Sequence, residues 1–230
     1  MLVYLYTETD FLTAEFMEDC LTWYPSDQVA YVRLAKVLHD KRDRCTSYLL
    51  LLRALETWRQ GERDLPLQRV DWASLQAMAQ RYKSIARQGT CEVERSASSC
   101  PMPLFEYAAK GKPSIKNIPD VHFNISHCRR AVALVLHDSE VGIDVETRRN
   151  VSNALINKVC NADEQRLVRA AADPVMEFLR LWTCKESMVK YTGMGLTGHL
   201  PSILATAPFG VKQVSIPLPF IDGWLTVTHQ

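Results

Sequence analysis

The most regular helical pattern in the chain lies between Phe178 and Leu196, where apolar residues recur at intervals of three, four and seven positions. This spacing predicts one long helix with a buried stripe, beside which Glu186 and Lys190 share a face. Both helix ends are signalled, because Asp173 is a good N-cap residue and Gly193 suits the left-handed conformation that often ends a helix. For the Glu186 and Lys190 pair alone, an ordinary surface ion pair is the simplest interpretation.

Strict alternation of apolar and polar residues marks the segment Val141 to Glu146, which predicts a strand. Asp144 and Glu146 point to the same face of this strand. Alone, such a strand is usually the edge of a sheet that shows its polar face to water. Neighbouring carboxylates repel each other, however, and a Mg²⁺ ion bound by their oxygens removes that cost. Glu186 is the candidate for a third ligand of the metal.

The remaining elements are predicted with weaker patterns. The expected helices are 13–23, 29–38, 48–55 and 71–87, and the expected strands are 2–6, 105–107, 211–217 and 224–229. The segment 121–136 reads as a hairpin with a polar turn at 126–129, which places Ser126 and His127 at a strand end. A histidine in such a turn is more often structural than functional. The segment 57–102 reads as an inserted or loosely attached arm that ends in a small, polar loop.

Composition narrows the classes of protein further. A chain of 230 residues with 47% hydrophobic residues can bury a large core, and its net charge of +1 gives no general attraction to nucleic acid or to anionic membranes. The seven cysteines are scattered and form no CxxC pair, so we expect reduced thiols and a cytoplasmic location. No signal peptide or apolar span of transmembrane length is apparent, and we expect a monomer without nucleic-acid or membrane partners.

Basic residues are concentrated in the segment Arg33 to Arg44, which holds five Lys or Arg residues against two Asp residues. A run of charges of this kind is usually a solvated face. The alternative is a phosphate-binding surface at the mouth of a cleft, for which the candidates are Lys36, Lys41 and Arg44.

The ordered motifs KGKP (110–113), FNISHC (123–128), VGIDVE (141–146) and FLRLWTCKESMVKYTGMGL (178–196) resemble those of the 4′-phosphopantetheinyl transferases. The resemblance is to the long, two-lobed type, the type that activates surfactin synthetase and other fatty-acid, polyketide and peptide synthetases. It covers 110–196 well and the arm 57–102 not at all. Cys128 stands where the family usually has serine.

The resemblance implies a site in which coenzyme A lies in a cleft beside a Mg²⁺ ion. The metal would be held by Asp144, Glu146 and Glu186. The phosphates of coenzyme A would be bound by Lys112, Ser126, His127, Lys185 and Lys190, with Lys36 and Arg44 as further candidates. The catalytic residues would be Glu186 as general base, Lys190 at the leaving phosphate, and Glu164 near the metal or the attacking hydroxyl.

The same resemblance implies an α+β fold of two similar lobes in a pseudo-twofold arrangement, 1–140 and 141–230, with the active site at their junction. The implied reaction is Mg²⁺-dependent transfer of the 4′-phosphopantetheine arm from coenzyme A to a serine of an acyl, peptidyl or aryl carrier protein, releasing 3′,5′-ADP. Two alternatives stay open. One is a non-catalytic relative that binds coenzyme A or a carrier protein, and the other is a Mg²⁺-dependent phosphohydrolase.

Overall fold

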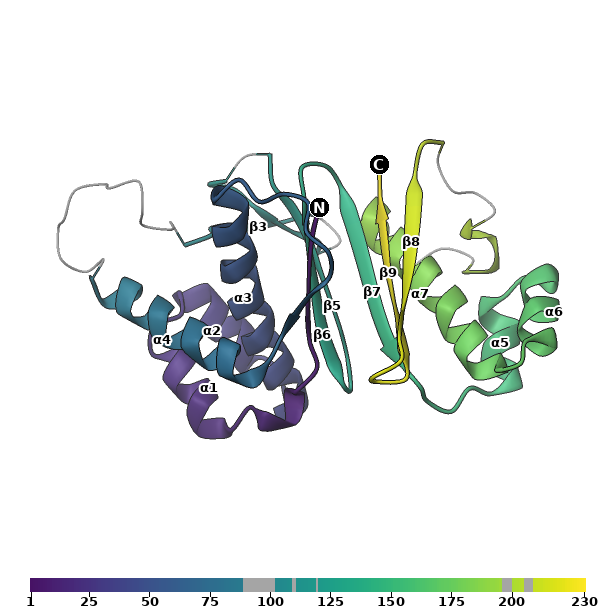
Figure 1. Cartoon of the computed structure of the whole chain (residues 1–230), viewed down its shortest axis with the longest axis horizontal. Coiled ribbons are helices and arrows are strands. Elements are labelled where there is room, and N and C mark those ends of the chain that lie inside the picture. The colour runs from purple at the N-terminus through teal and green to yellow at the C-terminus, as the bar shows by residue number, and fades with distance from the viewer. Residues whose placement is uncertain (89–101, 109–110, 119, 196–199, 205–208) are drawn as a thin grey trace.

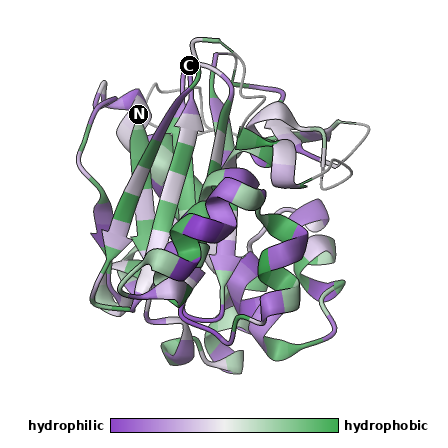
Figure 2. Ribbon diagram, turned by 90° about the vertical axis from the view of Figure 1, so that its right-hand side faces the viewer, coloured by the Kyte–Doolittle hydropathy of each residue, from purple (hydrophilic) through white to green (hydrophobic). Residues whose placement is uncertain are grey.

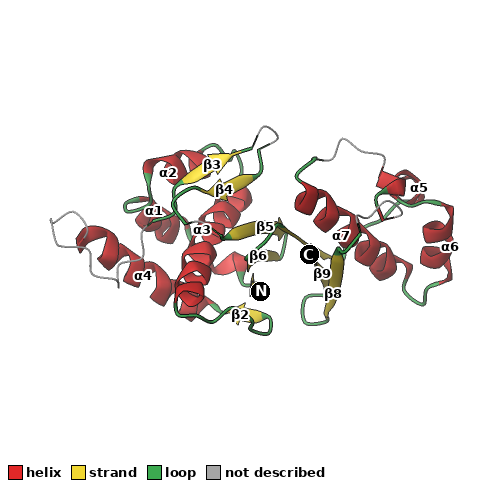
Figure 3. Ribbon diagram, turned by 90° about the horizontal axis from the view of Figure 1, so that it is seen from above, coloured by secondary structure: helices red, strands yellow, loops and turns green. Residues whose placement is uncertain are grey.

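The computed structural model describes residues 1–88, 102–108, 111–118, 120–195, 200–204 and 209–230. Helices form the two outer layers, and β-sheets lie between them, as the views from the side and from above show (Figures 1 and 3). This mixture of helix and sheet confirms the α+β class. The loop expected after the arm helix lies mostly outside the described residues.

The N-terminal half contains a sheet with the strand order β2-β1-β6-β5, covered on its outer face by helices. β1 and β2 run parallel, whereas β6 is antiparallel to both β1 and β5. The strands are β1 (Leu2–Tyr6), β2 (Gln68–Val70), β5 (His122–Cys128) and β6 (Ala131–His137), and β3 (Phe105–Tyr107) pairs separately with β4 (Pro113–Ile115). The helices are α1 (Ala14–Leu21), α2 (Ser26–Arg33), α3 (Leu38–Arg59) and α4 (Trp72–Gln88), with the 3-10 turn η1 (Thr9–Phe11).

The C-terminal half contains an antiparallel sheet with the order β7-β9-β8. Its strands are β7 (Val141–Thr147), β8 (Lys212–Leu218) and β9 (Gly223–His229), and its helices are α5 (Asn153–Val159), α6 (Ala162–Ala170) and α7 (Pro174–Thr192), with the 3-10 turn η2 (Leu200–Ser202). Helix α7 lies across this sheet (Figure 1). The predicted ends of α7 are confirmed: Asp173 accepts a hydrogen bond from the Met176 amide at 3.2 Å, and Gly193 is left-handed with φ 66°.

The two sheets share a hydrophobic core. Alternate residues of β1 and β6, such as Leu5 and Val135, point away from their own helices and join Ile143 and Val227 of the second sheet in one buried cluster. Each sheet therefore has one face against its helices and one face against the other sheet, in agreement with the apolar strands at the centre of Figure 2. The division at 140/141 marks the passage from one sheet to the other, but the two halves do not have separate interiors.

Strands β5 and β7 meet at the junction of the two sheets through side chains. The Asn124 carboxamide oxygen accepts a hydrogen bond from the Ile143 amide at 3.0 Å, and the Ser126 hydroxyl accepts one from the Val145 amide at 3.3 Å. Backbone amides of a buried strand need such partners. Polar side chains on β5 thus replace the backbone ladder between these neighbouring strands.

Three expectations about local structure need correction. The helix expected at 29–38 ends at Arg33, where α2 ends. The helix expected at 48–55 begins earlier, because residues 38–44 of the basic segment form the first turns of α3, and Lys and Arg are good helix formers. Strand β5 continues to Cys128, which pairs with Ala131, so the hairpin turns at Arg129 and Arg130 instead of at 126–129. The polar residues read as a turn belong to the junction with β7.

The arm is more firmly attached than its composition indicated. β2 adds a parallel strand to β1, and α4 buries Leu75, Ala79 and Tyr82 in the N-terminal core. Lys83 of α4 also forms an ion pair with Asp19 of α1. Residues 68–88 are therefore part of the folded body, whereas 89–101 lie outside the described residues.

Helix α7 approaches strand β7 most closely at Gly142. A Cβ atom at this position would lie 2.1 Å from the Ser187 carbonyl oxygen and 2.4 Å from the Tyr191 amide nitrogen. Both are backbone atoms, so rotation of a side chain cannot relieve the clash. Nearby hydroxyls complete the contact, because Ser187 and Thr228 hydrogen-bond at 2.8 Å across the same interface. Only glycine lets α7 lie this close to the sheet.

We predict that Gly142→Ala lowers the free energy of unfolding by about 3 kcal/mol, since the added methyl group must push α7 away from β7. Chemical denaturation measures this change. The control is Gly61→Ala, where φ is 85° and a Cβ meets nothing within 4 Å. Backbone strain alone there should cost about 1 kcal/mol. Equal losses in the two variants would show that the close approach at Gly142 is not the constraint.

Candidate active site

A buried cluster of charged and polar groups lies where β5, β7 and α7 meet. Lys190 of α7 donates hydrogen bonds to the Asp144 carboxylate at 2.6 Å and to the Ser126 hydroxyl at 2.8 Å. Ser126 in turn donates to Asp144 at 2.8 Å. Asp144 and Ser126 are both buried. The structure therefore brings together residues that are 64 positions apart in the sequence, and it places Ser126 inside a network of protein groups.

Glu186 lies one helical turn before Lys190 on α7 and is also buried. Burial, followed by the negative charges of Asp144 and Glu146, raises the pKa of Glu186 to about 7, although Lys190 and Arg149 act in the opposite direction. Burial likewise raises the pKa of Glu146, which forms an ion pair with Arg149 at 3.6 Å. The three carboxylates predicted as metal ligands therefore act on one another electrostatically.

Whether these groups fit a cation depends on the spacing of their carboxylates and on which of their oxygens lack a partner. Among the described residues, no set of three His, Cys, Asp or Glu side chains is close enough together to hold an ion as it stands. Nevertheless, Asp144 Oδ2 and Glu186 Oε1 are buried and have no hydrogen-bond partner within the described ranges. Buried carboxylate oxygens without partners are costly, and oxygen ligands are what Mg²⁺ prefers. The chemistry of these oxygens suits the ion.

Lys185 and Glu164 contact each other instead of the carboxylate cluster. The Lys185 ammonium is buried, forms an ion pair with Glu164 at 2.9 Å and donates to the Leu200 carbonyl at 3.0 Å. Glu164 also closes the capping box of α6 by accepting from the Asn161 amide at 2.8 Å. This ion pair joins α6, α7 and η2, and Glu164 contacts the lysine beside Glu186 instead of the carboxylate cluster itself.

Lys112 lies in the β3–β4 connection and binds groups of β7 and α7. Its ammonium donates to Glu140 at 2.6 Å, to the Val141 carbonyl at 3.3 Å and to the Tyr191 carbonyl at 3.2 Å. The expected turn is confirmed, because Gly111 is left-handed with φ 85°. Lys110 of the same motif lies outside the described residues. Lys112 thus ties the N-terminal half to the end of α7.

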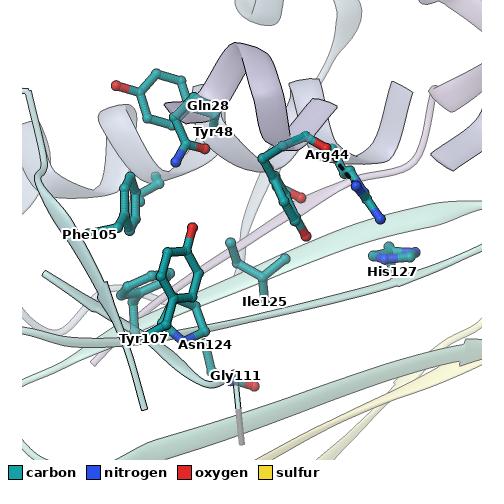
Figure 4. A pocket seen from close by; sticks show the side chains of 14 residues that line it. Gln28, Arg44, Tyr48, Phe105, Tyr107, Gly111, Asn124, Ile125 and His127 are labelled. Carbon is teal, nitrogen blue, oxygen red and sulfur yellow. Dashed lines mark hydrogen bonds between the residues drawn. The ribbon is translucent and has the colours of Figure 1, made fainter. Parts of the chain in front are cut away.

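A pocket of about 220 Å³ opens beside this cluster, between α2, α3 and the strands β3 to β5. Its wall is largely aromatic and includes Tyr31, Tyr48, Phe105 and Tyr107. Figure 4 shows Arg44 and His127 together at one end of the pocket, away from Phe105 and Tyr107. The pocket therefore joins an apolar, aromatic region to a basic end.

Arg44 is held in place by Tyr31. Its guanidinium lies over the Tyr31 ring at 4.4 Å from the centroid and donates to the Tyr31 carbonyl. Lys36, the other candidate of the basic segment, is exposed on the surface between α2 and α3 and is not among the residues that line the pocket. The structure therefore places Arg44, but not Lys36, at the basic end.

Sequence reasoning missed the aromatic wall and one buried acid. Asp43 is completely buried on α3, with the His127 ring nitrogen Nδ1 3.2 Å from its Oδ2 atom. The alternation of Phe105 and Tyr107 in β3 was a usable signal for the wall. Asp43 gave none, because it stood in a basic run that read as a solvated surface.

Comparisons with known proteins show which family the chain resembles. A family model described as the 4′-phosphopantetheinyl transferase superfamily matches residues 140–216, which include β7 and α7. The chain is 36% identical over 104 residues to the transferase psf-1 of Bacillus pumilus, covering 44% of this chain and 45% of that protein. It is 35% identical over 116 residues to the transferase Sfp of Bacillus subtilis, covering 47% of this chain and 49% of that protein.

A third relative is matched over a larger share of its own length. The 4′-phosphopantetheinyl transferase AcpT of Salmonella typhimurium is 31% identical over 148 residues, which is 58% of this chain and 77% of the relative. The chain belongs to the 4′-phosphopantetheinyl transferase superfamily. The transferase-like match spans about half the length of psf-1 and Sfp. Among the residues described, no helix of this transferase-family chain is both long enough and apolar enough to cross a membrane.

We predict that the apoprotein loses stability as the pH rises from about 4.5 to about 7, because Glu186 has its ordinary pKa of 4.5 when unfolded and a raised pKa of about 7 when folded. The folded state then binds the proton more tightly, so this contribution to stability is fully present below pH 4.5 and is lost above pH 7. Glu186→Gln should flatten the profile of melting temperature against pH, measured with a chelator.

The matched control for this pH profile is Glu62→Gln, which changes an exposed glutamate in the connection after α3. It should leave the pH dependence of the melting temperature as in the unmodified protein. A profile for Glu186→Gln that is as steep as that of the control would contradict the assignment of the raised pKa to this carboxyl.

Proposed function

We propose that this protein transfers the 4′-phosphopantetheine arm of coenzyme A to a serine of an acyl, peptidyl or aryl carrier protein and releases 3′,5′-ADP. The observation that carries the proposal is the juxtaposition of two features. One is the buried cluster of Asp144, Glu186 and Lys190, and the other is the aromatic pocket with Arg44 and His127 at its basic end. A planar base joined to phosphates fits the pocket, and a phosphoryl transfer needs the cluster.

Coenzyme A would place its nucleotide base against the aromatic wall and a phosphate at the basic end. Tyr31, Phe105 and Tyr107 offer ring faces and edges to a base, whereas Arg44 offers a planar, permanently charged donor to a phosphate oxygen. His127 lies beside Arg44, and His127 follows Ser126 on β5, which contacts Asp144. Strand β5 thus connects the end of the pocket to the carboxylate cluster.

In the proposed reaction, the serine hydroxyl of the carrier protein attacks the β-phosphorus of coenzyme A. A new bond forms between the serine oxygen and phosphorus, the bond from this phosphorus to the bridging oxygen breaks, and the electron pair leaves with 3′,5′-ADP. Glu186 accepts the serine proton as the general base, directly or through a water molecule. Lys190 offsets the charge that develops on the leaving phosphate.

Mg²⁺ would be held by Asp144, Glu146 and Glu186 and would supply electrostatic stabilisation of the phosphate oxygens when bound. Lys190 donates to Asp144 Oδ1, which leaves Asp144 Oδ2 for a cation. Lys112 would contribute positive charge at the edge of the site. Lys185 would bind the pyrophosphate only after its ion pair with Glu164 opens, and the closed pair fixes α7 against α6.

The direct test is incubation of the protein with coenzyme A, Mg²⁺ and an apo carrier protein, followed by mass spectrometry of the carrier. The expected result is the added mass of one phosphopantetheine arm on a serine. A protein that only binds coenzyme A would leave the carrier unmodified, and a phosphohydrolase would release 3′,5′-ADP with no carrier present. Either result would reject the transferase proposal. The monomeric state and the cytoplasmic location stay predictions.

Asp144→Asn and Glu186→Gln should each lower the rate of transfer by at least about a hundredfold, because each removes a charge needed at the reacting phosphate. Glu186→Gln should keep the melting temperature or raise it, since repulsion between buried carboxylates is relieved, whereas Asp144→Asn also loses the ion pair with Lys190 and should lower it. Transfer is measured by the mass assay at saturating coenzyme A. Asp138→Asn, an exposed acid between β6 and β7, is the control and should transfer normally. Normal transfer by Asp144→Asn would remove Asp144 from the site.

The surface beside the pocket suits a partner with acidic and apolar groups. Between α2 and α3, large apolar side chains are exposed next to basic ones, and α3 begins with further basic residues. The exposed apolar residues are Tyr31, Leu34, Val37 and Leu38, and the exposed basic residues are Arg33 and Lys36. Protein interfaces commonly combine an apolar centre with a charged rim. We propose this surface for docking of the carrier protein, whose acidic character the family resemblance implies.

Reversing charge at Arg33 and Lys36 with glutamate should raise the KM for carrier protein by roughly tenfold at low salt, because rim charges mainly set the rate of encounter. The defect should shrink at high ionic strength, where charges are screened. Steady-state kinetics at two salt concentrations measure both effects. The control reverses Lys158 and Arg166, which are exposed on α5 and α6. If both double variants behave alike, the docking surface lies elsewhere.

A further inference from the structure

The least expected group in the described part of the chain is the carboxylate of Asp43. It is completely buried on α3, and neither of its oxygens has a hydrogen-bond partner within the described ranges. A buried carboxylate without hydrogen bonds is strongly unfavourable. Such a residue destabilises the fold unless it has positively charged neighbours, so its presence points to a role outside stability.

Two imidazoles approach Asp43 from different elements. His127 Nδ1 of β5 and His39 Nε2 of α3 each lie 3.2 Å from Asp43 Oδ2. Both histidines are partly exposed, with 45% of the His127 side chain and 40% of the His39 side chain accessible. The carboxylate therefore lies beneath two rings that reach solvent. Only His127 is among the residues that line the aromatic pocket.

We propose that Asp43 is a positioning residue, which holds the Nδ1 side of His127 so that the opposite nitrogen, Nε2, is directed at an anionic group of the ligand in the pocket. The proposal rests on the proposed function for the identity of that ligand, coenzyme A. In a protonated imidazole both nitrogens are donors, so a carboxylate that accepts from one of them fixes the ring orientation and leaves the other to donate to an anion. The ligand phosphate and Asp43 would then lie on opposite sides of the same ring.

The position of Asp43 explains its complete burial. Arg44, the next residue of α3, points to the same end of the pocket as His127 (Figure 4). If the Asp43 carboxylate were exposed in the pocket, it would repel a phosphate and pair with this arginine. Because the carboxylate is covered, its charge acts through His127, and the pocket presents two donors to an anion. His39 supplies a second neighbour for the carboxylate without entering the pocket lining.

The test is a double-mutant cycle with Asp43→Asn and His127→Ala, in which the dissociation constant for coenzyme A is measured by calorimetry on the full chain. Asp43→Asn should raise this constant roughly tenfold, the loss typical of a hydrogen bond to a charged group. The double variant should bind no more weakly than His127→Ala alone, because Asp43 acts through that ring. In Asp43→Asn, the turnover number at saturating coenzyme A should change by less than about twofold.

Controls separate this role from a structural one. Asp40→Asn alters a partly exposed acid on the same helix and should not change the affinity for coenzyme A. Asp43→Asn keeps the size of the side chain and an oxygen that can accept a hydrogen bond, so it should melt near the temperature of the unmodified protein. A parallel cycle with His39→Asn should give independent, multiplicative effects.

The inference is overturned if Asp43→Asn binds coenzyme A as tightly as the unmodified protein, if its effect multiplies fully with that of His127→Ala, or if the coupling is to His39 instead. In each case, transfer by the unmodified protein can still be intact, so the proposed function stands. If the unmodified protein neither binds coenzyme A nor modifies a carrier, the proposed function and this inference fail together.

Discussion

The close contact of helix α7 with strand β7 at Gly142 is the constraint on which the site depends. Because the backbone of Ser187 and Tyr191 rests on the strand there, the same turns of the helix bring Glu186 and Lys190 to the polar face of β7 that carries Asp144. Side chains of β5 then complete the cluster from the opposite side. A shift of the helix by the width of a methyl group would separate a lysine from a carboxylate that it now contacts at 2.6 Å.

Much of this site could be predicted from local patterns. The caps of α7 and the alternation of β7 were confirmed, since each depends on residues within a few positions of one another. The two halves of the cluster were therefore known in outline. That Asp144 and Lys190 touch followed only from the structure, because it depends on how the helix is rotated and placed on the sheet.

The sequence could not reveal contacts in which a polar side chain binds a group far away in the chain. Ser126 was expected in a turn and Asn124 in a strand without a particular role, yet both bind the backbone of β7. Lys185 was expected to bind a phosphate of coenzyme A, and in the structure it is buried against Glu164. In a single sequence, a polar residue that binds a remote amide or carboxylate cannot be distinguished from one that faces water.

The core shared by the two sheets has a consequence for how ligands enter. In an enzyme whose lobes have separate interiors, a hinge can open the cleft between them and close it around the substrate. Here, Val3 and Val135 of one sheet pack against Ile143 and Val227 of the other, so a hinge motion would expose apolar surface of both. The two sheets therefore form a rigid framework at the site. Side chains at the rim of the site must move to fit the substrate, and one of them is Lys190, whose ammonium group contacts Asp144.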